Sequence, residues 1–226
     1  MKWLIKILLL TAPLVGYGQR DTTKLSFKKY YVPTGIRVGT DVISLVQNQV
    51  DETFSGWEAN LDVDFYRYYL AVDYGNWSRI YERDGLSYLN DGNYFRAGVD
   101  VNFLTQDPDR NMFFLGGRYG RSTLNEEFFY QEPDDAVLAR NTDVPGRWFE
   151  LTTGVRVKIW SFLWMGYTAR FKFGLKYGDT PEMVPHEVPG YGRTDRDSYW
   201  GFNYQILVRI PVRESPPLPP KKKKKK

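Results

Sequence analysis

The sequence predicts an all-β chain that closes into an antiparallel, up-and-down transmembrane β-barrel of about eight strands. First, apolar residues alternate with small or charged residues throughout residues 163–176. Successive side chains of a strand point to opposite faces, whereas a helix would hold Gly166 and Gly174 in its interior at about 1 kcal/mol each. Second, several such segments approach the roughly 9–11 residues of a tilted membrane-spanning strand. Third, the connections alternate between long and short, which is typical of long extracellular loops and short periplasmic turns.

The first four predicted strands place apolar residues on one face and charged residues or glycine on the other. They span residues 35–46, 57–65, 68–75 and 95–103. In the second of them, Trp57 and Leu61 oppose Glu58 and Asp62. The parity changes at residues 66–67, which predicts a tight turn, and the polar stretches 47–55 and 77–93 predict loops.

The last four predicted strands follow the same rule and span residues 111–121, 149–159, 163–176 and 200–210. The first of them is the least regular, and we expect Phe113, Leu115, Gly117 and Tyr119 to face outwards. Asp-Pro chemistry predicts a turn at 105–110, and residues 160–162 predict another. Residues 122–146 and 177–197 predict long loops. An even number of strands places both ends of the barrel on the side of the short turns, which is periplasmic in such barrels.

A soluble eight-stranded barrel or a secreted β-sandwich would also show alternation, and a lipocalin-like barrel would turn its apolar face inwards. Three features favour the membrane barrel. They are the strand length, the pattern of long and short connections, and the aromatic residues near strand ends, Trp57, Trp148 and Trp200, which suit a membrane interface.

The N-terminus predicts a secretory signal peptide over residues 1–18. Lys2 and Lys6 supply positive charge, an apolar run follows, and Gly16 and Gly18 precede a cleavage site before Gln19. An uncleaved anchor helix is disfavoured, because the apolar run is shorter than the roughly 20 residues of a span. We divide the remainder into an N-terminal periplasmic segment at 19–34, a barrel at 35–213 and a Pro-rich, polylysine periplasmic tail at 214–226. The absence of cysteine excludes disulfides, thiolate metal sites and lipidation at the cleavage point.

The net charge of +4 comes from the ends of the chain. Lys2, Lys6 and six C-terminal lysines make up eight of the 31 basic residues, which leaves 23 against 27 acidic residues. A surface that binds nucleic acid is therefore not predicted.

Two segments carry a resemblance to a known class. They are R-Y-Y-L-A-V-D-Y-G at 67–75 and G-N-Y-F-R-A-G-V-D-V-N-F-L at 92–104. The chain resembles the small outer-membrane β-barrel proteins of Gram-negative bacteria, and an uncharacterised family within that group. The resemblance implies a location in the bacterial outer membrane, in contact with lipid and lipopolysaccharide. Many such barrels end on an aromatic residue, whereas this last strand runs out at Ile210–Pro211 and a tail follows.

The inward-facing residues predict a charge network in the lumen, because an eight-stranded barrel is filled by its own side chains. The predicted members are Asp41, Glu58, Asp62, Asp64, Asp73, Asp100, Arg156, Lys158, Arg170, Lys172 and Arg209. Acids dominate the first four strands and bases the last four, so ion pairs can form across the lumen. We interpret the network as a charge-paired plug, and a proton or ion pathway is the alternative.

The single histidine, His186, lies beside Glu187 in a proline-rich loop. A lipid-modifying enzyme would need it near a serine such as Ser198 and a carboxylate, and no local spacing indicates this group, so we interpret His186 as an exposed loop residue. No catalytic residue, metal site or cofactor is predicted. The acidic, aromatic stretch at 126–135 can be a solvated loop or a partner-binding one.

The C-terminal tail joins P-P-L-P-P to six lysines. The predicted anion-binding residues are Lys221, Lys222, Lys223, Lys224, Lys225 and Lys226. Proline favours an extended spacer, and a lysine cluster attracts anionic lipid, cell-wall polymer or an acidic partner. A purely solubilising end is the alternative.

Together these features predict a non-enzymatic integral outer-membrane barrel with a structural or protein-interaction role, either alone or as a subunit of an envelope complex. A rim-active enzyme that modifies lipid or lipopolysaccharide is one alternative. A surface adhesin that binds through its long loops is the other.

Overall fold

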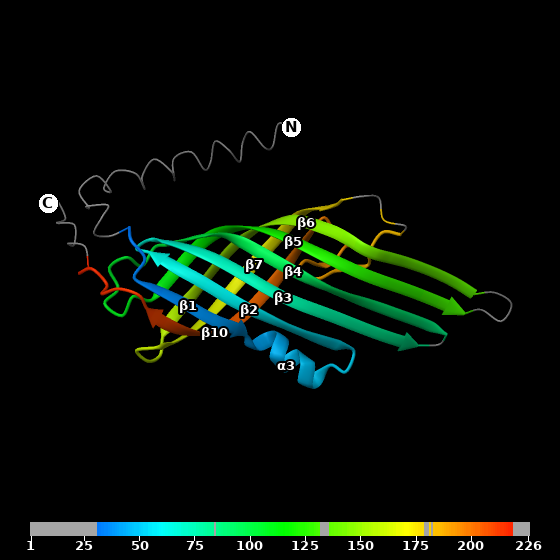
Figure 1. The fold of residues 1–226 in the computed structure, drawn as a ribbon, viewed down its shortest axis with the longest axis horizontal. Helices are drawn as coiled ribbons and strands as arrows, with labels where there is room; N and C mark the ends of the chain where they lie inside the picture. The colour runs from blue at the N-terminus through cyan, green and yellow to red at the C-terminus, as the bar shows by residue number, and fades with distance from the viewer. Residues whose placement is uncertain (1–30, 84, 132–135, 179–180, 182, 219–226) are drawn as a thin grey trace, which may run out of the picture.

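The computed structural model describes residues 31–83, 85–131, 136–178, 181 and 183–218. Eight antiparallel strands close into one barrel in the order β1-β10-β7-β6-β5-β4-β3-β2 (Figure 1). The strands are β1 Gly35–Asp41, β2 Phe54–Phe65, β3 Tyr68–Arg83, β4 Leu86–Asn102, β5 Met112–Gln131, β6 Ala136–Lys158, β7 Leu163–Tyr177 and β10 Ser198–Pro211. The predicted fold class, an antiparallel up-and-down barrel of eight strands, is confirmed.

Alternation along each strand separates an apolar outer face from a polar interior. In β7, Trp164, Thr168 and Arg170 are buried inside, while Tyr167 faces outwards. Closure gives the barrel part of each strand a hydrogen-bonded neighbour on both sides, because β1 pairs with β10 as well as with β2. The expected outward positions of strand β5 are confirmed, since Phe113, Leu115 and Tyr119 are exposed.

The short connections lie at one end of the barrel, which we call the turn end. Residues 66–67 form the tight turn that was predicted, with Tyr66 at φ +68°. Residues 103–111 and 159–162 form the other two short connections. Both described ends of the chain also lie here, where the Val212 N–H donates to the Thr34 carbonyl at 3.0 Å.

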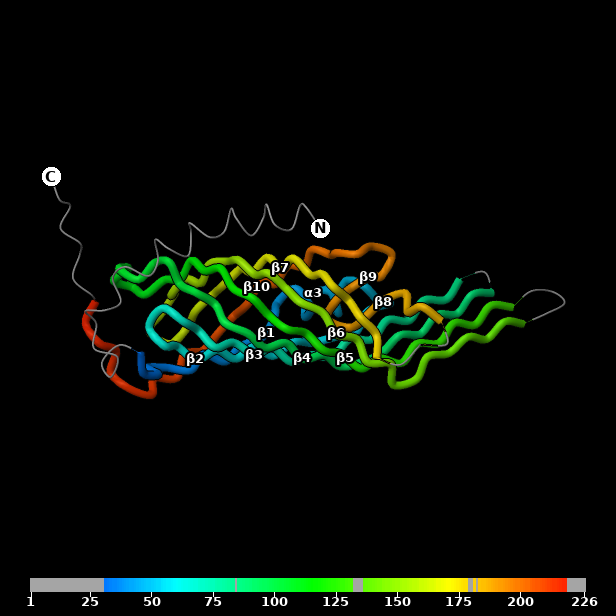
Figure 2. Tube along the Cα trace, turned by 90° about the horizontal axis from the view of Figure 1, so that it is seen from above, coloured from blue at the N-terminus to red at the C-terminus, as the bar shows by residue number. Residues whose placement is uncertain are grey.

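The predicted loops at 77–93 and 122–146 are wrong, because the strands continue through them. Strands β3 and β4 pair up to Arg83 and Leu86, and strands β5 and β6 up to Gln131 and Ala136. The result is a four-stranded extension that projects beyond the barrel (Figure 2). Its outer face carries polar residues such as Ser87, Asn93, Thr123, Asn125 and Glu127, so the apolar parity that marks the barrel strands is lost there although the strands go on.

The first strand also differs from the prediction, since it ends at Asp41 rather than at residue 46. Helix α3, Val42–Val50, follows it and lies on the outside of the barrel (Figure 1). The Asp41 carboxylate accepts the Ser44 N–H at 3.2 Å, which is the usual role of aspartate as an N-cap. The Asn48 amide fixes the helix to Gly56 of β2 through two 2.7 Å hydrogen bonds. Within the described residues, no helix has the length and apolar character needed to cross a membrane.

The long connection between β7 and β10 folds into the mouth of the barrel opposite the turn end. It contains the two-residue strands β8, Glu187–Val188, and β9, Gly192–Arg193, which pair with each other. Val188 and Tyr191 are fully buried against Tyr94, Leu124 and Trp148 of the barrel wall. The expectation that Trp148 lies at a membrane interface is therefore wrong, because its side chain points inwards and is fully buried. The prediction of a long loop here is therefore correct in position but misses that the loop closes the barrel.

Candidate functional site

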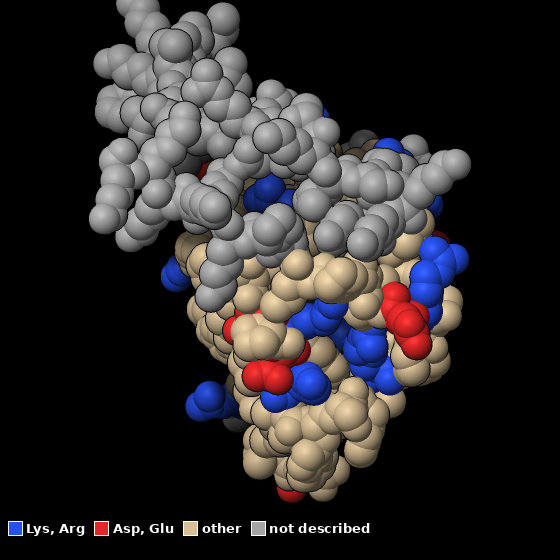
Figure 3. Space-filling view, turned by 90° about the vertical axis from the view of Figure 1, so that its left-hand side faces the viewer, with Lys and Arg blue, Asp and Glu red and all other residues tan. Residues whose placement is uncertain are grey.

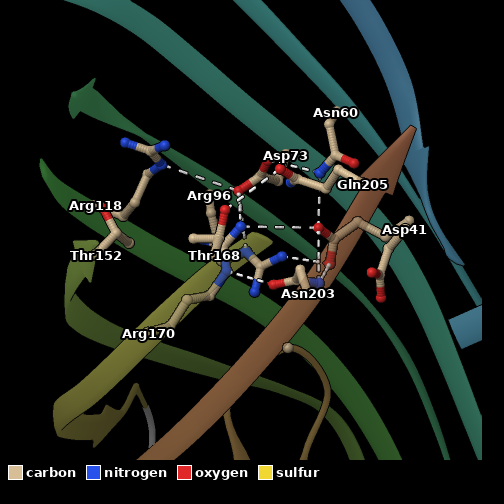
Figure 4. A network of polar contacts seen from close by, with 12 residues as sticks. Asp41, Asn60, Asp73, Arg96, Arg118, Thr152, Thr168, Arg170, Asn203 and Gln205 are labelled. Carbon is tan, nitrogen blue, oxygen red and sulfur yellow. Dashed lines mark hydrogen bonds and ion pairs between the residues drawn. The ribbon is translucent and has the colours of Figure 1, made fainter. Parts of the chain in front are cut away.

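The middle of the lumen holds an ion-pair network that joins strands on opposite sides of the barrel (Figure 4). Arg170 of β7 donates to Asp73 of β3 at 2.9 Å and to Glu150 of β6 at 3.0 Å. Arg96 of β4 pairs with Glu58 of β2. All five side chains are buried, so each charge depends on these partners rather than on water.

Two further groups extend the network along the barrel axis. Arg118 binds Asp100 through two 2.8 Å hydrogen bonds, in a bidentate arrangement. Nearer the turn end, Asp62 lies between Arg37, at 2.7 Å, and Arg156. Aromatic side chains fill the lumen around Arg37. The Arg37 guanidinium lies over the rings of Tyr69, at 4.7 Å, and Trp164, at 5.0 Å. The buried apolar side chains in this part of the lumen are Tyr69, Trp164, Phe114 and Met112.

Neutral polar residues complete the hydrogen bonding of the network. Asn60 donates to Glu58 at 2.7 Å and to Asp73 at 2.8 Å. Asn203 of β10 accepts from Arg170 Nε at 2.6 Å. Sequence analysis assigned Asn203 no role, because an amide carries no charge that could indicate its partner.

Four of the predicted lumen residues lie at the edges of this network or outside it. Lys158 is a correction: it lies at the end of β6, it is one-third exposed, and it pairs at 3.7 Å with Asp109 of a turn. Arg209 and Asp64, 3.5 Å apart, lie at the turn end around Thr34. Asp41 is buried but caps helix α3 and accepts the Tyr204 N–H at 2.9 Å. The positive end of the helix dipole, rather than an arginine, balances its charge.

Lys172, the remaining predicted cation, binds the loop that closes the mouth. Its ammonium donates to the backbone carbonyls of Gly190 at 2.8 Å and Tyr191 at 2.9 Å. The Tyr191 ring packs edge-on against Trp148, with 5.8 Å between centroids. Gly190 adopts φ +79°, and a Cβ there would lie 2.5 Å from the Tyr94 ring. We call residues 183–191 the mouth loop.

The mouth loop is also fastened to the extension. The Asn90 amide donates to the Glu187 carbonyl at 2.9 Å, and the His186 N–H donates to the Glu126 carboxylate at 2.9 Å. Asn141 donates to the Met183 carbonyl at 2.9 Å. Sequence analysis missed these contacts. Asn90 and Glu126 continue the inward-facing positions of strands β4 and β5, and this alternation was the available sign that both side chains point inwards.

The His186 side chain is exposed, and its ring packs edge-on against Tyr88, with 5.6 Å between centroids. Ser198, the serine considered for a catalytic group, begins strand β10. Within the described residues, no three histidine, aspartate or glutamate side chains are grouped so that they could hold a metal ion. Glu126, predicted to lie in a solvated or partner-binding loop, is instead buried in strand β5.

The turn end is covered by the start of the C-terminal tail. Arg110 donates to the Pro216 carbonyl at 2.5 Å, and Arg209 lies 3.5 Å from Ser215. A small cavity of about 40 Å³ remains between this segment and the barrel. Figure 3 shows basic and acidic side chains intermixed on this end of the molecule. The predicted signal peptide at 1–18 and the lysines 221–226 lie outside the described residues.

Comparison with solved structures finds chains that are similar to this one at low sequence identity. Neisserial surface protein A is 11% identical with a TM-score of 0.35, over 79% of this chain and 94% of that one. A major outer membrane protein from Thermus thermophilus is 12% identical with a TM-score of 0.33, over 79% of this chain and 98% of that one. The fold assignment rests on the strand topology described above. No curated protein matches the chain.

Residues 1–215 match the family described as "Domain of unknown function (DUF6048)". The match spans nearly all of the 226 residues, including every strand of the barrel. The chain therefore belongs to the DUF6048 family.

Proposed function

We propose that this protein is a non-enzymatic integral barrel of the bacterial outer membrane, with a closed lumen and a structural or protein-interaction role. One observation carries the proposal: the outer face of the barrel is apolar, whereas its interior is charged. Leu61, Leu115, Leu151 and Phe202 are each 40–54% exposed, while Asp100 and Arg170 are at most 1% exposed. The hydrophobic effect excludes this arrangement in water and favours it in a bilayer.

Aromatic residues on the outer face support the same placement. Trp200, Phe202, Tyr167 and Phe171 pack against one another on β7 and β10, with centroids 5.1–6.5 Å apart. Helix α3 adds apolar side chains that nothing in the described structure covers, including Val50 at 76% exposed. A short amphipathic helix beside the barrel wall suits the boundary between lipid headgroups and acyl chains.

The proposed orientation places the turn end in the periplasm and the four-stranded extension outside the cell. Because Arg110 holds Pro216 at the turn end, the tail leaves the barrel on the periplasmic side. The tail lysines would then reach anionic lipid, cell wall or an acidic periplasmic partner. Deletion of Lys221–Lys226 should reduce co-sedimentation with purified cell wall, and unchanged co-sedimentation would reject this role of the tail.

Insertion into a bilayer is tested with the purified mature chain. We expect it to need detergent or lipid to stay monomeric and to migrate differently on gels before and after heating, as folded membrane barrels do. A mature chain that is folded and monomeric in plain buffer would contradict the proposal.

The closed lumen is tested by planar-bilayer recording. Ion pairs fill the middle of the lumen and the mouth loop covers one end, so we expect no steady conductance. A large, constant channel would show that the lumen is open.

Surface binding is the second candidate function, and the extension favours it. Strands β5 and β6 are 20 and 23 residues long, well beyond the about 9–11 residues that span a bilayer. The excess length projects a sheet away from the membrane. Replacing residues 126–141 by a short turn should abolish surface binding while leaving the barrel inserted.

A further inference from the structure

The inward face of the extension forms two rows of side chains across strands β3, β4 and β5. Nearer the barrel, Arg79, Asn90 and Glu126 lie in register. One step further out, Tyr81, Tyr88 and Phe128 lie in register and form an aromatic row. Inside the closed barrel, the inward-facing side chains fill the lumen. In the extension the sheet is not closed, so the inward-facing side chains line a surface groove.

The mouth loop forms the opposite wall of this groove with Met183 and Val184. The cavity has a volume of about 550 Å³, within the usual range for sites that bind small molecules. Its lining is mainly apolar although it lies beyond the apolar band of the barrel. Tyr81 is 39% exposed and Val184 is 75% exposed. Exposed apolar surface of this kind, bordered by charged residues, marks binding sites.

The floor of the groove carries excess negative charge. Arg79 pairs with Glu187 at 3.0 Å and with Asp51 at 3.6 Å, so its single charge is already matched. Glu126 is 1% exposed, and among the described residues it forms no salt bridge. Its carboxylate accepts only neutral donors, the Tyr88 hydroxyl at 2.7 Å and the His186 N–H at 2.9 Å, with two amides at 3.4 Å. A buried carboxylate is stabilised by a cation, and none of the chain's described cations supplies it.

We propose that this groove binds an amphipathic cation, a small molecule with one amine and an apolar body. The amine lies over Glu126, and the apolar body lies along the row of Tyr81, Tyr88 and Phe128. Aromatic faces add attraction for a cation, and the charge of the floor selects an amine over an alcohol or an acid of the same shape. This inference goes beyond the proposed function of the barrel, because it assigns a class of ligand to the four-stranded extension.

The test compares three probes of one shape: 1-naphthylmethylamine, 1-naphthylmethanol and 1-naphthoate. The full chain is placed in nanodiscs of phosphatidylcholine, which carries no net charge, and binding is measured by calorimetry against empty nanodiscs. We expect the amine to bind at least about tenfold more tightly than the alcohol, and the acid most weakly. Equal affinity for the three probes, or no binding of the amine above empty nanodiscs, would overturn the proposal.

Glu126→Gln should remove the preference for the amine while the alcohol still binds, because the glutamine oxygen can still accept from Tyr88 and His186. The matched control is Glu127→Gln, next in the chain, whose carboxylate is 42% exposed and faces the other side of the sheet. It should leave the preference unchanged. Retention of the preference in Glu126→Gln would overturn the assignment of the cation site.

Phe128→Ser provides a second variant that leaves the fastening of the mouth loop intact. This substitution should weaken the binding of the amine and of the alcohol by a similar factor, because it changes only the aromatic row. Unchanged affinity for both probes would overturn the position of the apolar body. Heat-dependent gel migration of each variant reports barrel insertion separately, so a failed barrel is distinguished from a failed groove.

Discussion

The lumen of the barrel and the inward face of the extension follow the same alternation but reach different results. Inside the barrel, Asp73 and Asp62 each contact an arginine from the opposite side of the barrel, Arg170 and Arg156, while Asp100 and Glu150 contact arginines of neighbouring strands. On the extension, Glu126 has only neutral donors. Closure explains the contrast, because a closed sheet brings opposite strands within ion-pairing distance while an open sheet faces solvent. One strand pattern therefore builds an ion-paired core in one region and a groove in the other.

The strongest test of this contrast is Arg170→Met, which leaves Asp73 and Glu150 without their closest cation. Breaking a buried ion pair by removing one partner costs about 3–5 kcal/mol. We expect that loss in the free energy of unfolding, measured by urea unfolding in phospholipid vesicles with tryptophan fluorescence. A loss below about 1 kcal/mol, the usual value for an exposed pair, would mean that water rather than arginine balances these carboxylates.

The outer faces of the two regions should differ as well. Leu151 lies on the outer face of the barrel, paired with Gly117 and Phe171, while Leu89 lies on the outer face of the extension. Leu151→Arg should cost about 2–4 kcal/mol, as for a cation near the bilayer midplane. Leu89→Arg should cost little, because in the proposed orientation this side chain lies beyond the lipid. Equal costs in the same unfolding measurement would place the membrane boundary elsewhere.

The mouth loop, which separates the two regions, should respond to Gly190→Ala. The substitution strains a residue at φ +79° by about 1–2 kcal/mol and forces a Cβ against Tyr94. We expect faster hydrogen exchange at residues 185–191 and little change in the barrel strands. Gly117→Ala is the control, since its nearest neighbour would be 3.8 Å away and its φ is ordinary. Unchanged exchange in the Gly190 variant would show that the loop is not held by this turn.

The sequence was sufficient to predict the barrel, because each barrel strand carries an apolar outer face and a polar face towards the lumen. Leu163–Tyr177 shows both faces in one strand. Beyond the closed barrel, only the alternation of the inward face remains. Residues 122–131 therefore look like a loop, although Leu124, Glu126 and Phe128 continue the inward face.

Partners in the lumen were harder to predict than its composition. Parity places Arg170 and Lys172 inside, but which carboxylate each one meets depends on strand stagger around the closed barrel. The structure joins Arg170 to Asp73, which lies 97 residues earlier, and gives Lys172 two backbone carbonyls of the mouth loop. Sequence analysis missed helix α3, because Asp41 fits an inward-facing position of a strand. The structure shows that Asp41 caps the helix by accepting the Ser44 N–H.

The smallest expected effect belongs to Arg140→Met, on the outer face of the extension. Arg140 lies 3.6 Å from Glu127, but the two side chains are 66% and 42% exposed. Exposed pairs contribute about 0–1 kcal/mol, and salt weakens them further. We expect no measurable change in the unfolding free energy at 150 mM salt, about physiological strength, while Arg170→Met stays destabilised there. If both variants lost stability equally, burial would not be what separates the barrel charges from those of the extension.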